Sequence, residues 1–201
     1  YPKIGVNVIV ESDELKDYRN YEFLDMNFNE HENIIYGDNA QGKTNILESI
    51  YMCSTSKSHR GSKDREIVRF GEDESHIKLN VLKHGMKYRI DMHLKKNKTK
   101  GIAVNGIPIK NAVELFGIIN IVFFSPEDLN IIKNGPSERR RFMDMELSQL
   151  DKIYLSNLVN YNKVINQRNK LHKDIAFSPS EQVMQSHDIC DKQLVKFASI
   201  I

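Results

Sequence analysis

Polar and apolar residues alternate along two stretches of the chain, residues 77–81 and 88–92. Alternation puts every second side chain on the same side of an extended chain, so each stretch is predicted to be a β-strand with one buried face. His84–Gly85 lies between these stretches, and Asn105–Gly106 lies between two shorter apolar runs. Both dipeptides favour tight hairpin turns. The pattern therefore predicts antiparallel strands across residues 75–109.

The N-terminal part of the chain predicts a further hairpin. Residues 8–15 are a predicted strand, residues 18–21 (Tyr-Arg-Asn-Tyr) a polar turn, and a second strand is expected around residues 23–28. Residues 1–7 predict no element. We interpret them either as an irregular N-terminus or as a remnant that is not native.

Two runs are predominantly apolar: residues 34–36, and residues 118–124 apart from Asn120. Such runs are typical of strands that are buried on both faces, and we expect the second to lie beside the first. Residues 125–128 (Ser-Pro-Glu-Asp) then predict the start of a helix, because a capping serine, an early proline and acidic residues favour a helix N-terminus.

The C-terminal part of the chain predicts helices. Pro136 begins one helix that runs toward Leu150, and residues 151–201 are helical apart from a break near residues 177–180. The last helical pattern reaches Ile201 without a stop signal, so we expect a truncated segment.

The segment after the first apolar run fits the pattern G-x-x-x-x-G-K-[ST]. Its residues are Gly37, Asp38, Asn39, Ala40, Gln41, Gly42, Lys43 and Thr44. Apolar residues of the next segment recur at the spacing of a helix with one buried face: Ile46, Leu47, Ile50 and Tyr51. A strand, a glycine-rich loop and a helix in this order indicate a phosphate-binding loop rather than a chance match in a glycine turn.

Each fixed residue of this loop has a physical role in binding the phosphates of a nucleotide. Gly37 and Gly42 allow a tight loop whose N–H groups point inward, and the following helix directs its free N–H groups to the same place. Lys43 can reach the β- and γ-phosphates, and the Thr44 hydroxyl can bind Mg²⁺. A nucleotide that carries β- and γ-phosphates, together with Mg²⁺, is therefore the expected ligand; the family resemblance described below implies that the nucleotide is ATP.

Composition limits the other classes of function. The 201 residues are 40% hydrophobic and 28% charged, with a net charge of +2, so a nucleic-acid surface must be a local patch. Two cysteines far apart in sequence fit a reducing cytosol rather than a disulfide framework. No apolar run approaches the ~18 residues that span a membrane. The seven histidines are scattered without metal-ligand spacing, so no zinc site is predicted.

A basic loop follows the phosphate-loop helix. Lys57, Arg60 and Lys63 are its candidate DNA-binding residues, with His59 and Arg65 beside them. The alternative is a solvated polar loop, because basic loops are common and the net charge is low.

Several segments occur together in an order that resembles a known family. They are residues 18–21, the phosphate loop 37–44 with Asn-Ile-Leu-Glu at 45–48, Ser-His-Arg at 58–60, Phe-Ser-Pro-Glu-Asp-Leu at 124–129 and Arg-Arg-Arg-Phe at 139–142. The series resembles the N-terminal half of the RecF family of bacterial recombination mediators, over roughly residues 8–201.

The resemblance implies an α/β fold. It would be an ABC/SMC-type P-loop ATPase lobe with antiparallel β additions over residues 8–150, followed by a helical arm segment over residues 151–201. It also implies a cytoplasmic protein that forms an ATP-dependent homodimer when full length. Such proteins bind DNA (duplex, gapped or junction) when ATP is bound. With a RecR-like mediator they help to load recombinase at single-strand/double-strand junctions in replication and in the repair of DNA damage, including the SOS response.

The sequence departs from a complete head of this type. It has no apolar strand followed directly by the Walker B aspartate and glutamate, and no Ser-Gly pair for the signature segment. We therefore expect a lobe that binds ATP with little hydrolysis, and a weak ATPase only in the full-length dimer. By the same resemblance Glu127 is a candidate for sensing the γ-phosphate and Mg²⁺; simple capping of a helix is the alternative.

A stand-alone P-loop kinase or NTPase is the alternative function. In that interpretation residues 57–65 would bind an acceptor phosphate. The antiparallel additions, the helical tail and the missing Mg²⁺ aspartate argue against it, because such an enzyme needs a complete site of its own.

Overall fold

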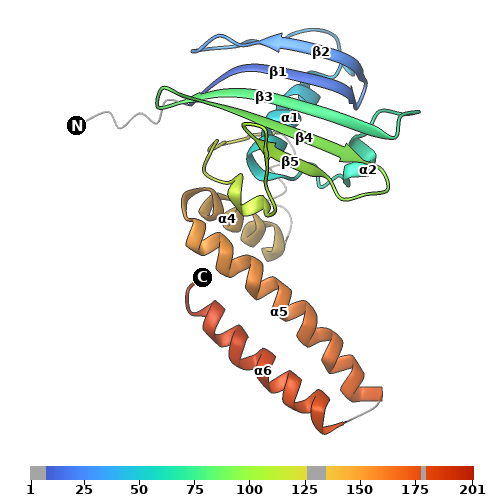
Figure 1. Cartoon of the computed structure of the whole chain (residues 1–201), viewed down its shortest axis with the longest axis vertical. Coiled ribbons are helices and arrows are strands. Elements are labelled where there is room, and N and C mark those ends of the chain that lie inside the picture. Colours follow the sequence, from blue (N-terminus) through green and yellow to red (C-terminus); the bar gives the residue numbers. More distant parts are fainter. Residues whose placement is uncertain (1–7, 126–134, 178–179) are drawn as a thin grey trace, which may run out of the picture. The chain divides into compact units, whose positions relative to one another are not determined.

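The computed structural model describes residues 8–125, 135–177 and 180–201. The chain forms two compact units, Tyr1–Phe124 and Ser125–Ile201, and each is described by itself (Figure 1). Within the described residues no helix is both long and apolar enough to cross a membrane.

The first unit contains one antiparallel sheet with the strand order β2-β1-β3-β4-β5-β6 (Figure 1). Its strands are β1 (Val8–Tyr18), β2 (Tyr21–Asn27), β3 (Glu74–Lys83), β4 (Met86–Lys95), β5 (Gly101–Val104) and β6 (Ile107–Pro108). Every pair of neighbouring strands is antiparallel. The hairpins predicted from alternation are therefore confirmed, and β1 is longer than expected.

The two predicted hairpin turns have the backbone that their residues favour. His84 and Gly85 have φ values of 51° and 77°, and Asn105 and Gly106 have values of 52° and 79°. Two consecutive positive φ values are typical of the tight turn whose twist matches that of the flanking strands. These dipeptides therefore fix the register of β3 with β4 and of β5 with β6.

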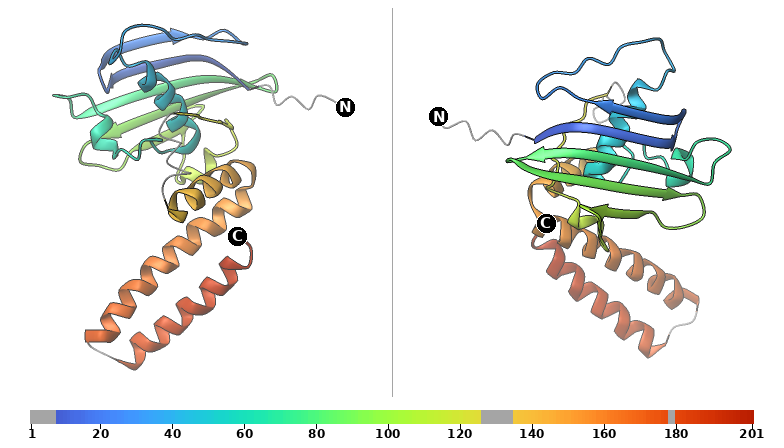
Figure 2. Two further views of the ribbon diagram at one scale, coloured as in Figure 1. Left: turned by 180° about the vertical axis from the view of Figure 1, so that it is seen from behind. Right: turned by 45° about the horizontal axis from the view of Figure 1, so that its top comes forward.

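Helix α1 (Lys43–Thr55) lies across one face of the sheet, as Figure 2 shows. Alternate residues of β3 and β4 are buried toward this face and form the core with Leu15 and Tyr18 of β1 and Met52 and Cys53 of α1. The short helix α2 (Asp64–Ile67) and a single 3-10 turn, η1 (Ala112–Glu114), complete the unit. The opposite face of β3 and β4 carries polar residues.

The two apolar runs do not form the strands that the sequence predicts. Residues 34–36 have no strand structure, and the side chains of Ile34 and Tyr36 are 86% and 89% exposed. Residues 118–124 have only an isolated bridge at Ile119, and Val122 is 89% exposed. A strand forms only where a neighbour supplies hydrogen-bond partners, and the described part of the chain supplies none for a ladder here. The prediction of two adjacent buried strands is therefore wrong for this chain.

The buried face of α1 also differs from the one that the apolar spacing predicts. Leu47 is 42% exposed, whereas Glu48 and Ser49 are fully buried. The polar side chains can be buried because each has hydrogen-bond partners, so apolar spacing alone misidentifies the face.

The part of the second unit that the structure describes contains three helices, α4 (Pro136–Leu150), α5 (Lys152–Phe177) and α6 (Glu181–Ala198). The predicted helix start at Pro136 and the break after Phe177 are confirmed. Helices α5 and α6 lie side by side (Figures 1 and 2), with Arg168 Nε 2.5 Å from Asp191 Oδ1. Tyr154 donates a hydrogen bond from its hydroxyl to Asp144 Oδ1 at 2.6 Å, which joins α5 to α4.

In the structure α4 belongs to the same compact unit as α5 and α6. The sequence instead places residues 136–150 in the ATPase lobe. The predicted boundary at residue 150 separates an ATPase lobe from an arm segment by function, and it stays a prediction.

Candidate phosphate-binding site

The loop before α1 has the left-handed backbone that its glycines permit. The φ values of Gly37, Ala40 and Gly42 are 147°, 65° and 97°. A Cβ at Gly42 would lie 2.6 Å from Asn20 Oδ1 and 2.8 Å from the Tyr21 hydroxyl. Gly42 therefore meets two demands at once, a positive φ and a close approach of the β1–β2 turn.

Helix α1 begins at Lys43 with Gly42 as its N-cap residue. The N–H groups of a first helical turn have no partner within the helix and carry the positive end of its dipole. Lys43 Nζ donates hydrogen bonds to the carbonyl oxygens of Gly37 at 2.6 Å and of Asp38 at 2.5 Å. The ammonium group thus lies within the loop, at the same place as the N–H groups.

These groups fit a phosphate chain. Phosphate oxygens accept charge-assisted hydrogen bonds, which are stronger than those that Lys43 makes to neutral carbonyls. Residues 37–41 are exposed, so the loop is open to a ligand. Thr44 is also exposed in the first turn of α1, where its hydroxyl could hold Mg²⁺ beside the phosphates.

The β1–β2 turn supports the loop. Asn20 Nδ2 and the Tyr21 hydroxyl donate hydrogen bonds to the carbonyl oxygen of Gln41 at 3.2 and 3.3 Å. Asn45 Nδ2 donates to Asn20 Oδ1 at 2.8 Å. The turn therefore connects to both the loop and the first turn of α1, a role that the sequence pattern did not indicate.

Glu48 is the centre of a second set of contacts behind the loop. Its carboxylate is fully buried and accepts two hydrogen bonds from Arg19, at 2.9 and 2.7 Å, and one from the Ser58 hydroxyl at 2.5 Å. The Arg60 guanidinium lies 3.8 Å away. Burial acts to raise the pKa of Glu48, but the hydrogen bonds from Arg19 and Ser58 and the nearby arginine charges lower it below the ordinary value.

This arrangement joins segments that are far apart in sequence. The sequence predicts residues 18–21 as a turn, residues 45–48 as part of a helix and residues 58–60 as part of a basic loop, and the structure brings the three segments together around Glu48. A carboxylate on the buried side of a helix indicates that a basic partner lies nearby. The sequence alone does not show that this partner is Arg19.

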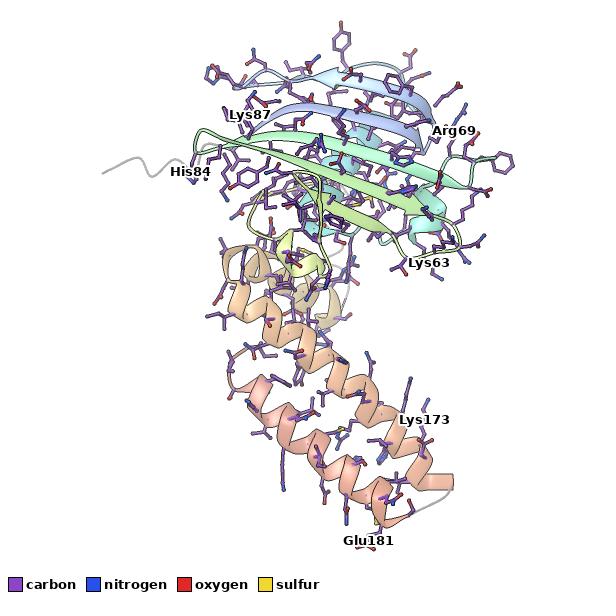
Figure 3. All side chains as sticks on the ribbon, viewed as in Figure 1. Lys63, Arg69, His84, Lys87, Lys173 and Glu181 are labelled. Atoms are coloured by element: carbon purple, nitrogen blue, oxygen red, sulfur yellow. The ribbon has the colours of Figure 1, made fainter. Side chains whose placement is uncertain are left out.

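The basic loop after α1 has two kinds of residue. Lys57 and Lys63 are exposed, and Figure 3 labels Lys63 at the edge of the unit. Arg60 instead donates a hydrogen bond to Asn45 Oδ1 at 3.1 Å and lies near Glu48, so its charge is already paired. Their contact with DNA stays a prediction.

Lys100 joins the two ends of this loop. Its ammonium group donates to the Ser56 carbonyl at 2.5 Å and to Asp64 Oδ1 at 3.0 Å, and its side chain is only 17% exposed. Lys100 is therefore not a freely solvated side chain, unlike Lys98 in the same turn, which is exposed. Glu127 lies outside the described residues.

A buried carboxyl group holds α1 against the sheet. Asp13 of β1 is fully buried, and the Ser49 hydroxyl donates to its Oδ2 at 2.5 Å. Burial raises the pKa of Asp13 to about 7, although the hydrogen bond from Ser49 acts in the opposite direction. The pair therefore joins β1 to α1 in the interior of the unit.

A hollow of about 290 Å³ adjoins the start of the loop. It is lined by Met26, Asn27, Phe28, Asn33, Ile34, Ile35 and Tyr36. Apolar and aromatic side chains next to a phosphate site offer a surface against which a nucleotide base can pack.

The fold and the loop define the class of protein. The chain belongs to the family described as AAA domain, whose model matches residues 14–196. Its curated relatives are named DNA replication and repair protein RecF. The protein from Lachnospira eligens is 92% identical over 194 residues, which are 96% of this chain and 53% of that protein. The one from Agathobacter rectalis is 62% identical over 190 residues, 94% of this chain and 52% of that protein.

Solved structures agree with these relatives. The recombination mediator protein RecF with ATP in the RecFOR pathway is 35% identical, with a TM-score of 0.90, and the match covers 98% of this chain and 52% of that one. An SMC ATPase structure matches at 20% identity with a TM-score of 0.53, and this likeness shows the fold alone. The RecF resemblance and the α/β fold of the ABC/SMC ATPase type are therefore confirmed. The chain spans about half the length of the curated relatives that it matches.

Proposed function

We propose that this chain is an ATP-binding lobe of a protein that acts in DNA replication and repair. The observation that carries the proposal is the position of Lys43 at the N-terminus of α1, with its ammonium group inside a loop of left-handed residues. ATP would place its phosphates in residues 37–44 and its base near the hollow beside Tyr36. Thr44 would hold Mg²⁺.

The named relatives support the wider role. The protein in a matching solved structure binds ATP and is described as a recombination mediator in the RecFOR pathway. By analogy, ATP binding would control a homodimer of the whole protein and its contact with gapped or junction DNA. A RecR-like mediator would then help it to load recombinase.

Binding of ATP by this chain alone is expected without appreciable turnover. Phosphoryl transfer depends on acids that hold Mg²⁺ and direct water, and on a segment that reaches the γ-phosphate from a partner head. A site that only binds ATP stabilises the ground state and does little for the barrier. Titration with ATP–Mg²⁺ and parallel assays of phosphate release test this proposal. Binding with phosphate release near background supports it, and turnover that depends on Lys43 would favour a stand-alone P-loop enzyme.

The proposed DNA contact is best tested with Lys57→Glu and Lys63→Glu together, in a protein of the full length of the relatives. Both lysines are exposed, whereas Arg60 is unsuitable because a second carboxylate there would face buried Glu48. Loss of two phosphate contacts should weaken duplex binding and lower its salt dependence by about one unit of slope per lysine. Binding of ATP should be unchanged.

Lys98→Glu is the matched control for this experiment, because Lys98 is an exposed lysine in the turn between β4 and β5. The control changes the net charge by half as much as the double variant, so half the effect in the control would mean that only net charge matters. If the double variant bound DNA with the affinity and salt slope of the unchanged protein, the loop would be solvated and would not contact DNA.

A further inference from the structure

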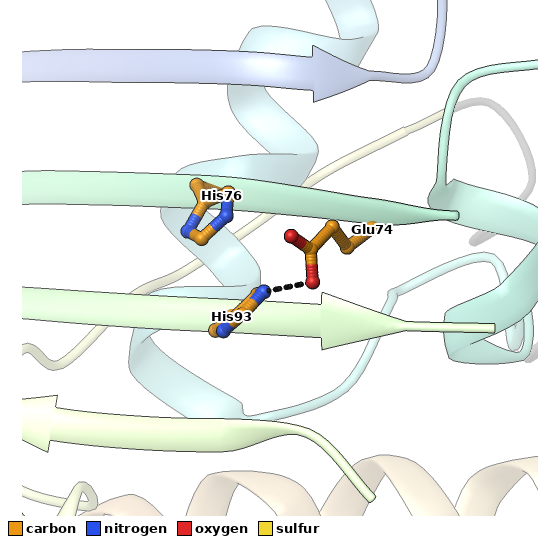
Figure 4. Close-up of side chains that lie close together, drawn as sticks. All are labelled: Glu74, His76 and His93. Carbon is orange, nitrogen blue, oxygen red and sulfur yellow. Dashed lines mark hydrogen bonds and ion pairs between the residues drawn. The ribbon is translucent and has the colours of Figure 1, made fainter. Parts of the chain in front are cut away.

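Two histidines and a glutamate meet on the polar face of the sheet, opposite α1. Glu74 and His76 belong to β3 and His93 to β4, and Figure 4 shows their side chains on the same face. Their neighbours Ser75 and Ile77 point into the core, so the alternation of the strands fixes this orientation. The sequence predicts no zinc site, because 17 positions separate the two histidines; strand pairing brings them together.

The three side chains lie close enough together to bind one ion. His76 and His93 are direct cross-strand partners, and their rings stack with centroids 3.9 Å apart, so one ring must turn for both to direct a nitrogen lone pair at the same ion. His93 Nε2 lies 2.9 Å from Glu74 Oε2. One ligand atom from each residue lies within 4.8 Å of the others.

The ionisation of the cluster favours binding of a cation. Burial, followed by the charge of His93, lowers the pKa of His76 below its ordinary value. The hydrogen bond from His93 lowers the pKa of Glu74. At neutral pH these shifts favour a neutral imidazole and an ionised carboxylate, which are the forms that ligate metals. Two nearby positive charges disfavour the binding of a cation. Lys95 lies 3.4 Å from Glu74, and Lys16 is opposite His76 in β1.

We propose that Glu74, His76 and His93 form a binding site for a divalent transition-metal ion, with Zn²⁺ as the best match. Two imidazole nitrogens and one carboxylate suit Zn²⁺, Co²⁺ or Ni²⁺ rather than Mg²⁺, which prefers oxygen ligands. Three protein ligands leave a coordination position for water or another ligand. The ion would join β3 to β4 and would be separate from the Mg²⁺ expected at the phosphate loop.

The test is a titration of the whole chain with Zn²⁺ by calorimetry, and with Co²⁺ by visible absorption. His76→Gln and His93→Gln should each weaken binding at this site at least tenfold, because each removes one ligand. Zn²⁺ should also raise the melting temperature of the unchanged protein, since a ligand of the folded state stabilises it, and should do so less in either variant. Excess Mg²⁺ should not displace the ion.

Two controls make the result specific. His84→Asn changes an exposed histidine at the opposite end of the β3–β4 hairpin, which Figure 3 labels, and asparagine tolerates its positive φ. This variant should bind Zn²⁺ normally. His187→Gln changes another cluster, with Asp188 and Asp191 in α6, where Asp191 is already paired with Arg168. Binding that survives in both His76→Gln and His93→Gln, or that His187→Gln abolishes, would overturn the proposal. Melting curves without metal establish that the variants fold.

Discussion

Lys43→Ala is expected to lower the affinity of the chain for ATP–Mg²⁺ by about 10- to 100-fold. Hydrogen bonds to charged groups contribute about 1.5–3 kcal/mol, and each 1.4 kcal/mol is a factor of ten in affinity. The ammonium group of Lys43 already lies in the loop, 2.6 Å from the Gly37 carbonyl, so it needs little rearrangement to reach a phosphate. Equilibrium binding of a labelled ATP analogue measures the change.

The fold of the Lys43 variant should be intact, because this half-exposed side chain donates hydrogen bonds to loop carbonyls and is not part of the hydrophobic core. Melting temperature and circular dichroism check this point. Lys98→Ala serves as the matched control, since it removes an exposed lysine far from the loop in sequence and should leave ATP affinity unchanged. An alanine variant at Lys43 that binds ATP as tightly as the unchanged chain would refute the assignment of the loop.

Glu48→Ala should produce the largest loss of stability, about 3–5 kcal/mol, as is typical when one partner of a buried ion pair is removed. Arg19 and Ser58 would then lose their shared acceptor, and Arg19 is only 17% exposed. ATP affinity should also fall, because Arg19 begins the turn whose Asn20 and Tyr21 support the phosphate loop. Chemical denaturation measures the free energy of unfolding.

Two comparisons separate charge from packing at this position. Glu48→Gln keeps the shape and one acceptor, so its loss should be intermediate. Glu14→Ala breaks the ion pair with Lys78, in which both side chains are more than a third exposed, and should cost less than about 1 kcal/mol. The pKa of Glu48 is lowered by its partners, so the stability it contributes should be present at neutral pH and be lost as pH falls through the acidic range. Equal losses for Glu14→Ala and Glu48→Ala would contradict a special role for the buried carboxylate.

Much of the fold could be predicted from local sequence patterns. The antiparallel strands at residues 75–109 follow from alternation and from two dipeptides that accept positive φ, and both features act over a few residues. The phosphate loop is equally local, because its geometry is specified within eight consecutive residues and the helix after them. Such features can be predicted from a single sequence.

Features that depend on distant partners could not be predicted in the same way. The runs at residues 34–36 and 118–124 are apolar enough for buried strands, but a strand also needs a neighbour, and the described residues provide no ladder for either run. The partnership of Glu48 with Arg19 and the meeting of His76 with His93 depend on strand register and helix orientation. The spacing of residues along the chain determines neither the strand register nor the helix orientation.

The most direct test of the ATP-binding lobe is an NMR titration of the 201-residue chain with a non-hydrolysable ATP analogue and Mg²⁺. Each perturbed backbone amide would be assigned to its residue. The account predicts saturable shifts centred on Gly37–Thr44, with smaller ones at Asn20 and Tyr21, and no such response in Lys43→Ala. An absence of binding, or shifts centred on residues 57–65 with the loop unaffected, would contradict it.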